Sequence, residues 1–196
     1  HNNWAASARI TNANWTLNMK YLLVGLLAAM ITTPLAAKDF PGFYRMQTQF
    51  QAPENKCFEG SRVDPSLSLG GAARMDDCQN VTGQLWIVIP AGQGQYRLST
   101  AFQMPEGKCL EGNKFDRSST LGGAAFLDDC QNVSGQLWKF EPAGNGWYRL
   151  KTVFQGNNKC LEGNKFDPAS TLGGAAFMDN CQNVSGQLWK FVPAGN

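Results

Sequence analysis

The feature that most constrains this chain is an internal repeat that occurs three times. The tripeptide Gln-Leu-Trp appears at 84–86, 136–138 and 187–189, so successive copies are offset by 52 and 51 residues. Each copy also carries Lys-Cys-Phe/Leu-Glu-Gly, at 56–60, 108–112 and 159–163. Residues 109–145 and 160–196 differ at only five positions. Such self-similarity predicts one supersecondary unit used three times, at approximately 42–93, 94–145 and 146–196.

Each copy has the pattern of four short strands separated by turn residues. In the second copy we expect strands at Tyr96–Phe102, Cys109–Glu111, Gly123–Leu127 and Leu137–Phe140. Pro142–Gly146 is rich in turn-forming residues and is expected to be the turn that precedes the third copy. No part of the repeats has a sustained helical period. Three such units therefore predict an all-β sandwich or barrel with twelve strands.

The number of units narrows the choice of architecture. Three equal four-stranded units suit a closed barrel capped by hairpins, the β-trefoil, in which closure leaves few open edges. A solenoid would need capping units that differ from the middle one. A propeller uses more than three blades. We therefore expect a β-trefoil with pseudo-threefold symmetry.

The six cysteines fall into three pairs, one pair in each copy, and they are Cys57/Cys78, Cys109/Cys130 and Cys160/Cys181. Six cysteines allow 15 pairings. The repetition favours one disulfide inside each unit, and each would stabilise the fold by roughly 3 kcal/mol. A zinc site is a poor alternative because the chain has no Cys-x-x-Cys pair and no histidine within the repeats.

The N-terminal region has the pattern of an export signal. Met19-Lys20 is followed by an apolar run at 21–31 and by small residues up to Ala37. Eleven apolar residues are too few to span a bilayer as a helix, so we expect a signal peptide at 19–37 with cleavage after Ala37. Residues 1–18 are interpreted as a leader or non-native segment. The expected domain is then 38–196, without a membrane span and with a secreted or periplasmic, bacterial location.

Charge and histidine content exclude several classes of function. Two of the 17 basic residues, Arg9 and Lys20, precede the expected domain, which then has 15 basic and 15 acidic residues. A neutral domain argues against a nucleic-acid partner, because such binding needs a basic surface. The only histidine is His1. Ser-His and Cys-His nucleophile pairs and His-ligated metals are therefore not expected, and we assign no cofactor.

The combination of Cys-Leu-acidic, a second Cys and Gln-Leu-Trp resembles the ricin B-type lectin family. The resemblance extends over residues 43–195 and implies a β-trefoil that binds sugars, often attached to a toxin or a glycosidase. The family's sugar-binding carboxylate would correspond to Glu59, Glu111 and Glu162, where Asp is more usual. Its stacking aromatic would fall at Asp76, Asp128 and Asp179, and its Asn at Gly83, Gly135 and Gly186. The standard galactose pocket is therefore not expected in its usual form.

A different pocket is expected in the loop that follows each carboxylate. Glu-Gly-Asn-Lys-Phe-Asp occurs at 111–116 and again at 162–167, whereas the first copy has Ser61-Arg62-Val63 after its glutamate. Carboxylates and amides bind sugar hydroxyls, and an aromatic ring packs against the C–H face. We therefore predict working sites in the second and third copies only. Their candidate ligand-binding residues are Glu111, Asn113, Phe115, Asp128, Asn132, Gln136, Glu162, Asn164, Phe166, Asp179, Asn183 and Gln187.

Some of these residues also have structural interpretations. Gln84, Gln136 and Gln187 can instead satisfy buried backbone groups, and the tryptophans of Gln-Leu-Trp can fill the barrel. Asp128 and Asp129 can be a solvated turn. Calcium has suitable oxygen ligands here, but the spacing matches no known calcium loop.

The leading functional hypothesis is a non-catalytic glycan-binding protein with two or three sites. The sequence leaves open whether a toxin or hydrolase domain is fused to it or acts as its partner. A protein-binding trefoil, such as a protease inhibitor or an adhesion subunit, is the alternative, although such proteins present one unique loop. A glycosidase would need two carboxylates at a set separation, for which Glu111 and Asp128 are the candidates.

Overall fold

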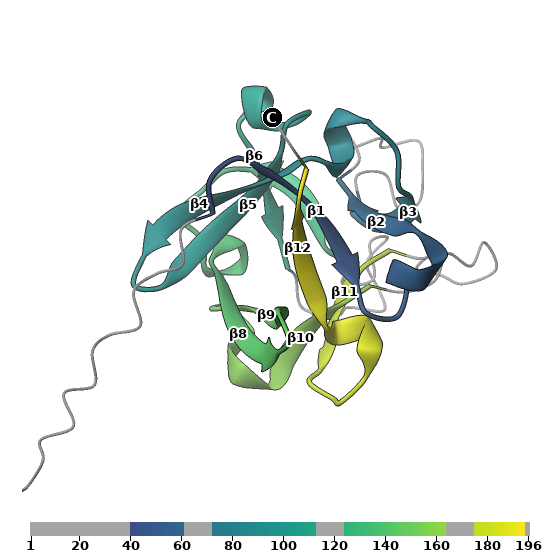
Figure 1. Ribbon diagram of the computed structural model, residues 1–196. Coiled ribbons are helices and arrows are strands. Elements are labelled where there is room, and N and C mark those ends of the chain that lie inside the picture. Colours follow the sequence, from purple (N-terminus) through teal and green to yellow (C-terminus); the bar gives the residue numbers. More distant parts are fainter. Residues whose placement is uncertain (1–39, 61–71, 113–123, 164–174, 195–196) are drawn as a thin grey trace, which may run out of the picture. The chain divides into compact units, whose positions relative to one another are not determined.

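Three four-stranded units close into one barrel in the computed structural model, which describes residues 40–60, 72–112, 124–163 and 175–194. All of them belong to the compact unit 36–196, and the expected leader and signal peptide lie outside the described residues. The first and fourth strands of each unit form the barrel in the order β1-β12-β9-β8-β5-β4 (Figure 1). These strands are β1 (Phe43–Thr48), β4 (Trp86–Gly92), β5 (Gln95–Thr100), β8 (Trp138–Gly144), β9 (Trp147–Thr152) and β12 (Trp189–Pro193).

The second and third strands of each unit form a separate antiparallel hairpin. The pairs are β2 (Lys56–Glu59) with β3 (Arg74–Asp77), β6 (Lys108–Glu111) with β7 (Phe126–Asp129), and β10 (Lys159–Glu162) with β11 (Phe177–Asn180). Short 3₁₀ turns complete each unit, at η1 (Ala52–Glu54), η2 (Thr82–Gln84), η3 (Met104–Glu106), η4 (Ser134–Gln136), η5 (Gly156–Asn158) and η6 (Ser185–Gln187). The described residues contain no α-helix, and the predicted β-trefoil is confirmed.

The three hairpins meet in a cyclic set of backbone hydrogen bonds. The amide of Ala73 donates to the carbonyl of Ala125 at 2.7 Å, Ala125 to Ala176 at 2.7 Å, and Ala176 to Ala73 at 2.8 Å. The preceding alanines, 72, 124 and 175, form a buried cluster of their own. Alanine suits these positions because a larger side chain would prevent three backbones from approaching so closely.

Tryptophan fills the barrel, as predicted. Trp86, Trp138 and Trp189 have no exposed surface. Each indole N–H donates to the carbonyl of the residue after the first cysteine, at 2.7, 2.9 and 2.8 Å to Phe58, Leu110 and Leu161. A buried indole therefore has its single donor satisfied while its ring supplies core volume.

Several predicted strand boundaries are wrong. The strand expected at Tyr96–Phe102 ends at Thr100, because the Thr100 hydroxyl accepts the amide of Gln103 at 3.2 Å and turns the chain. The third strand begins at Phe126 and runs to Asp129, later than expected. The fourth strand continues to Gly144, since a bulge near the exposed Pro142 lets pairing resume. The turn is thus only Asn145-Gly146, both with positive φ.

All three intra-repeat disulfides are present. They join Cys57 to Cys78, Cys109 to Cys130 and Cys160 to Cys181, with Cα–Cα distances of 4.8, 4.9 and 5.0 Å. Each disulfide links the first strand of a hairpin to the residue that follows the second strand of the same hairpin. The loop that leads to the next 3₁₀ turn is thereby tied to the hairpin that carries the candidate carboxylate.

Candidate functional site

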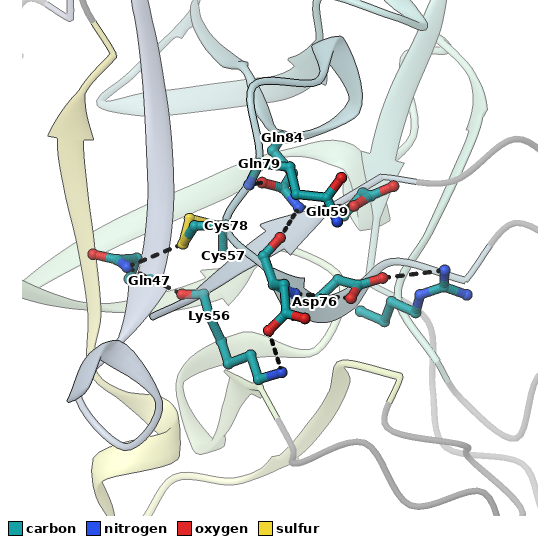
Figure 2. A network of polar contacts seen from close by, with 10 residues as sticks. Gln47, Lys56, Cys57, Glu59, Asp76, Cys78, Gln79 and Gln84 are labelled. Carbon is teal, nitrogen blue, oxygen red and sulfur yellow. Dashed lines mark hydrogen bonds and ion pairs between the residues drawn. A yellow bond between two sulfur atoms is a disulfide. The ribbon is translucent and has the colours of Figure 1, made fainter. Parts of the chain in front are cut away.

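Each hairpin ends in a glutamate that is bound by a buried glutamine. Glu59, Glu111 and Glu162 are the last residues of β2, β6 and β10. One carboxylate oxygen of each, Oε2, accepts a hydrogen bond from the Nε2 of Gln84, Gln136 and Gln187, at 2.8, 3.1 and 2.9 Å respectively. Figure 2 shows this contact in the first copy, with Gln84 directed at Glu59. The carboxylate is therefore held at a fixed place in all three copies.

The glutamines support the site from inside the fold. Gln136 is fully buried; its Nε2 also donates to the carbonyl of Asp129 at 2.8 Å, and its Oε1 accepts the amide of Gln131 at 2.8 Å. Gln187 is buried in the same way, with equivalent bonds. Both Nε2 donor positions are therefore occupied. These bonds let Gln136 and Gln187 orient the carboxylate from a buried position. Direct contact of the two glutamines with a ligand stays a prediction.

Two departures from the family pattern, glutamate in place of aspartate and glycine in place of asparagine, are linked in the structure. A Cβ atom added to Gly135 would lie 3.1 Å from Cγ of Glu111, and one added to Gly186 would lie 3.3 Å from Cγ of Glu162. The extra methylene of glutamate thus occupies space that a side chain at the glycine would need. Glutamate in place of the usual aspartate is compatible with this site because the next turn presents glycine.

A phenylalanine lies directly across the hairpin from each glutamate in the second and third copies. Glu111 pairs with Phe126, and Glu162 pairs with Phe177. Directly opposed residues of an antiparallel pair project from the same face, with Cβ atoms about 5 Å apart. Both rings are partly exposed. Aromatic and carboxylate groups are therefore neighbours in these two copies.

The first copy has a cation at this position. Glu59 pairs with Arg74, whose Nη2 contacts the Oδ2 of Asp76 at 3.4 Å. A guanidinium lacks the apolar face that a phenylalanine offers to sugar C–H groups. The first site therefore differs from the other two in the structure as well as in the sequence.

An exposed phenylalanine from the next repeat is bound through its backbone to the turn beside each glutamate. The amide of Phe154 donates to the carbonyl of Ser134, in the turn that carries Gly135 and Gln136, at 3.1 Å, and the Phe154 side chain is 53% exposed. Phe50 and Phe102 make the equivalent contacts with Ser185 and Thr82. Sequence analysis did not select these residues. The available signal was Thr-x-Phe-Gln, which begins at 48, 100 and 152 and so recurs in every copy.

The other predicted residues are dispersed. The Oδ1 atoms of Asp128 and Asp179 accept the amide of the following residue, at 2.8 and 2.7 Å, so each carboxylate is part of a local turn. Asn132 is exposed, and its Oδ1 accepts from Nη2 of Arg97 at 3.3 Å. Asn183 is also exposed. Asn113, Phe115, Asn164 and Phe166 lie outside the described residues.

In the first two copies, an ion pair joins the two hairpin strands at the end away from the glutamate. Lys108 Nζ lies 2.7 Å from Asp129 Oδ1, and Lys56 makes the same pair with Asp77. The hydrogen bond that each lysine donates to its aspartate raises the pKa of that lysine. In the third copy the partner is the neutral Asn180, at 2.9 Å from Lys159. These pairs are on the surface and are expected to add little stability.

Within the described residues, no cluster of three or more histidine, cysteine or acidic side chains is arranged for a metal ion. Over the same residues, no helix has the length and apolar character needed to cross a bilayer.

A closed threefold barrel with a glutamine-bound carboxylate in each hairpin defines a lectin-type β-trefoil. The family model for the ricin-type beta-trefoil lectin domain matches residues 46–189. The chain belongs to this family, as the sequence resemblance predicted. A search of curated proteins found no match.

Solved structures with a similar fold are more distant in sequence. ThreeFoil, a designed threefold-symmetric protein, is 22% identical with a TM-score of 0.57, over 77% of this chain and 98% of that one. An exo-β-1,3-galactanase from Clostridium thermocellum is 19% identical with a TM-score of 0.58, over 79% of this chain but only 31% of the galactanase. SeviL, solved with the asialo-GM1 saccharide, is 17% identical with a TM-score of 0.51, over 79% and 98%. These likenesses show the β-trefoil fold.

Proposed function

We propose that this protein is an exported, non-catalytic glycan-binding module whose working sites are centred on Glu111 and Glu162. The observation that carries the proposal is the carboxylate held by a buried glutamine beside an aromatic ring. Gln136 uses only Oε2 of Glu111. Among the described residues, no donor bonds Oε1 of Glu111, and we assign this oxygen as the acceptor for a sugar hydroxyl.

Aromatic rings complete the recognition surface. Phe126 lies across the hairpin from Glu111, and Phe154 from the next repeat is anchored on the adjoining turn. Sugars present hydroxyl edges and an apolar C–H face, and a carboxylate next to an aromatic ring matches both. The third copy repeats the arrangement with Phe177 and Phe50, whereas the first has Arg74. Each chain should therefore have two glycan sites of similar, weak affinity, in the second and third copies. A multivalent glycan would bind more tightly through avidity.

The hydrogen bonds that the acidic side chains accept within the fold support a non-catalytic role. Oε2 of Glu111 accepts from Gln136, and Oδ1 of Asp128 accepts a backbone amide, so one oxygen of each carboxylate is used in a structural contact. Three disulfides support export, because such bonds persist in oxidising compartments. The galactanase, in which this chain matches 31% of the length, supports the further proposal that a catalytic or toxin domain accompanies the module.

The test is a titration with a neutral glycan that is first identified on an array. Calorimetry should give two sites per chain. Glu111→Gln and Glu162→Gln should each remove one site, and the double variant should not bind, because a charge-assisted hydrogen bond contributes roughly 1.5–3 kcal/mol. Glu59→Gln is the matched control, since it makes the same change in the first copy and should leave both sites intact.

Two results would overturn the proposal. Unchanged glycan binding by the double variant would place the pocket elsewhere. Absence of any array signal, together with retention of a protein ligand, would mean that this trefoil binds proteins. Circular dichroism should be the same for all variants, because amide for carboxylate preserves shape and the contact with the glutamine.

A further inference from the structure

A second concave site lies on the first repeat, apart from the glutamate sites. It has a volume of about 400 Å³. It is lined by Arg45, Gln47, Asn55, Cys57, Cys78, Gln79, Asn80 and Val192. Figure 2 shows Gln47 directed at the disulfide, where its Nε2 contacts the carbonyl of Lys56 at 3.1 Å and the sulfur of Cys78 at 3.4 Å. Glu59 is not part of this lining.

The pocket contains one cation and no counter-charge. Arg45 is the only charged residue in the lining, which otherwise consists of four carboxamide side chains, the disulfide and a valine. The Nε of Arg45 is buried and has no hydrogen-bond partner among the described residues. A guanidinium has five N–H donors, and a buried donor without an acceptor is costly. Arg45 therefore lacks an anionic or strongly accepting partner.

The counterparts of Arg45 in the other two repeats have acceptors beside them, although the buried Nε of Arg97 also has no hydrogen-bond partner among the described residues. In the second copy, Nη2 of Arg97 donates to the Oδ1 of Asn132 at 3.3 Å and to the carbonyl of Gln131 at 3.5 Å. In the third copy, Arg149 lies directly across the barrel strands from Glu141, which also binds Lys151 at 2.5 Å. A carboxylate thus already stands beside the third arginine.

The corresponding position in the first copy is apolar. Arg45 lies across from Val192, as Arg97 lies across from Ile89. The pocket lining contains no carboxylate in place of Glu141. It contains Asn80, the counterpart of Asn132, but no hydrogen bond joins Asn80 to the Nε of Arg45. The repeats thus contain three versions of one arginine environment. Among the described residues, Arg45 is the one of the three arginines that lines the pocket and has neither a hydrogen bond to a loop residue nor a carboxylate across the strand pair.

We propose that the pocket around Arg45 binds the carboxylate of an acidic sugar unit, such as a uronic acid. Arginine forms paired, charge-assisted hydrogen bonds with carboxylates. The carboxamides of Asn55, Gln79 and Asn80 both donate and accept, as sugar hydroxyls require, and the volume suits one sugar ring. The sugar part of this inference rests on the proposed function; the carboxylate part rests on Arg45 alone.

The test is a titration of the full chain with glucuronate, followed by NMR or calorimetry. Glucuronate should bind once per chain, glucose should not bind at this pocket, and added salt should weaken the complex. Arg45→Gln should reduce glucuronate affinity by about tenfold or more, the effect expected when a charge-assisted pair is lost. The Glu111→Gln, Glu162→Gln double variant should still bind glucuronate, which separates failure of this inference from failure of the proposed function.

A second variant tests the charge argument without altering the arginine. Val192→Glu should place a carboxylate opposite Arg45, as in the third repeat, and should abolish glucuronate binding. Val192 is 36% exposed, so the fold should tolerate the change. Ile89→Glu is the matched control opposite Arg97 and should leave binding intact.

Equal affinity for glucuronate in the wild type, Arg45→Gln and Val192→Glu would overturn the inference. Acetate that binds as tightly as glucuronate would overturn its sugar part and would leave a simple carboxylate site.

Discussion

Placing a second carboxylate against Glu111 should make the stability of this protein depend strongly on pH. In Gln136→Glu, an oxygen replaces the Nε2 that lies 3.1 Å from Oε2 of Glu111. It also faces the carbonyl of Asp129, which the same Nε2 contacts at 2.8 Å. Two unit charges at this separation repel by about 5 kcal/mol at an effective dielectric constant of about 20. Protonation of the introduced carboxyl relieves this repulsion.

The sign and the upper limit of this pH effect on the free energy of unfolding follow from the linkage between protonation and folding. Burial and the neighbouring carboxylate raise the pKa of the introduced carboxyl in the folded state. Its unfolded-state pKa stays at the ordinary glutamate value of about 4.3. The variant is therefore relatively most stable below that pH and loses stability as pH rises towards the folded-state pKa. The loss is at most about 1.4 kcal/mol per pH unit, or about 4 kcal/mol by pH 7.

Urea unfolding of the wild type, Gln136→Glu and Gln136→Met at pH 4, 5.5 and 7 measures this effect. The methionine variant loses the same hydrogen bonds without adding a charge, so its deficit of about 1–3 kcal/mol should not change with pH. Only the deficit of Gln136→Glu should grow. A deficit of Gln136→Glu that is the same at pH 4 and pH 7 would show that Glu111 does not lie against this glutamine.

Three further changes test the core, the disulfides and the glycine position. Trp138→Ala should cost about 3–5 kcal/mol in thermal or urea unfolding, because it leaves a cavity; an unchanged melting temperature with lost glycan binding would make the ring a surface stacker instead. Replacing Cys109 and Cys130 by serine should cost roughly 3 kcal/mol with the other two disulfides intact, and an unchanged urea midpoint would contradict this value. Gly135→Ala should weaken glycan binding at the second copy only, since its Cβ would lie 3.1 Å from Cγ of Glu111, and equal loss at the third copy would argue for a general destabilisation.

Regular spacing made much of the fold predictable. The repeat defined the number of strands, and a hairpin-capped barrel is the closed arrangement that suits three such units. The disulfide pairs and the buried tryptophans followed from the same regularity. The strand ends did not, because they depend on contacts such as the one between Thr100 and Gln103 and on the bulge at Pro142, which alternation of polar and apolar residues does not encode.

The candidate site was only partly visible in the sequence. Glu111 was selected from its place after the cysteine, and the structure keeps it at the surface of the hairpin. The sequence left Gln136 ambiguous between ligand contact and structural support. Its burial and its bond to a residue 25 positions earlier favour structural support. Phe154 was missed because it reaches the site from the next repeat.

The sequence by itself determined the threefold repetition, the pairing of cysteines within each copy and the neutral charge of the repeats, because these are properties of composition and spacing. Tertiary structure alone decided which groups share an environment. Arg45, Arg97 and Arg149 occupy equivalent places in the sequence, yet their surroundings differ because each lies against a strand whose facing residue is Val192, Ile89 or Glu141. Strand pairing sets those cross-strand neighbours, and loop contacts such as that between Asn132 and Arg97 add to them, so the three arginines differ in the acceptors that already lie beside them.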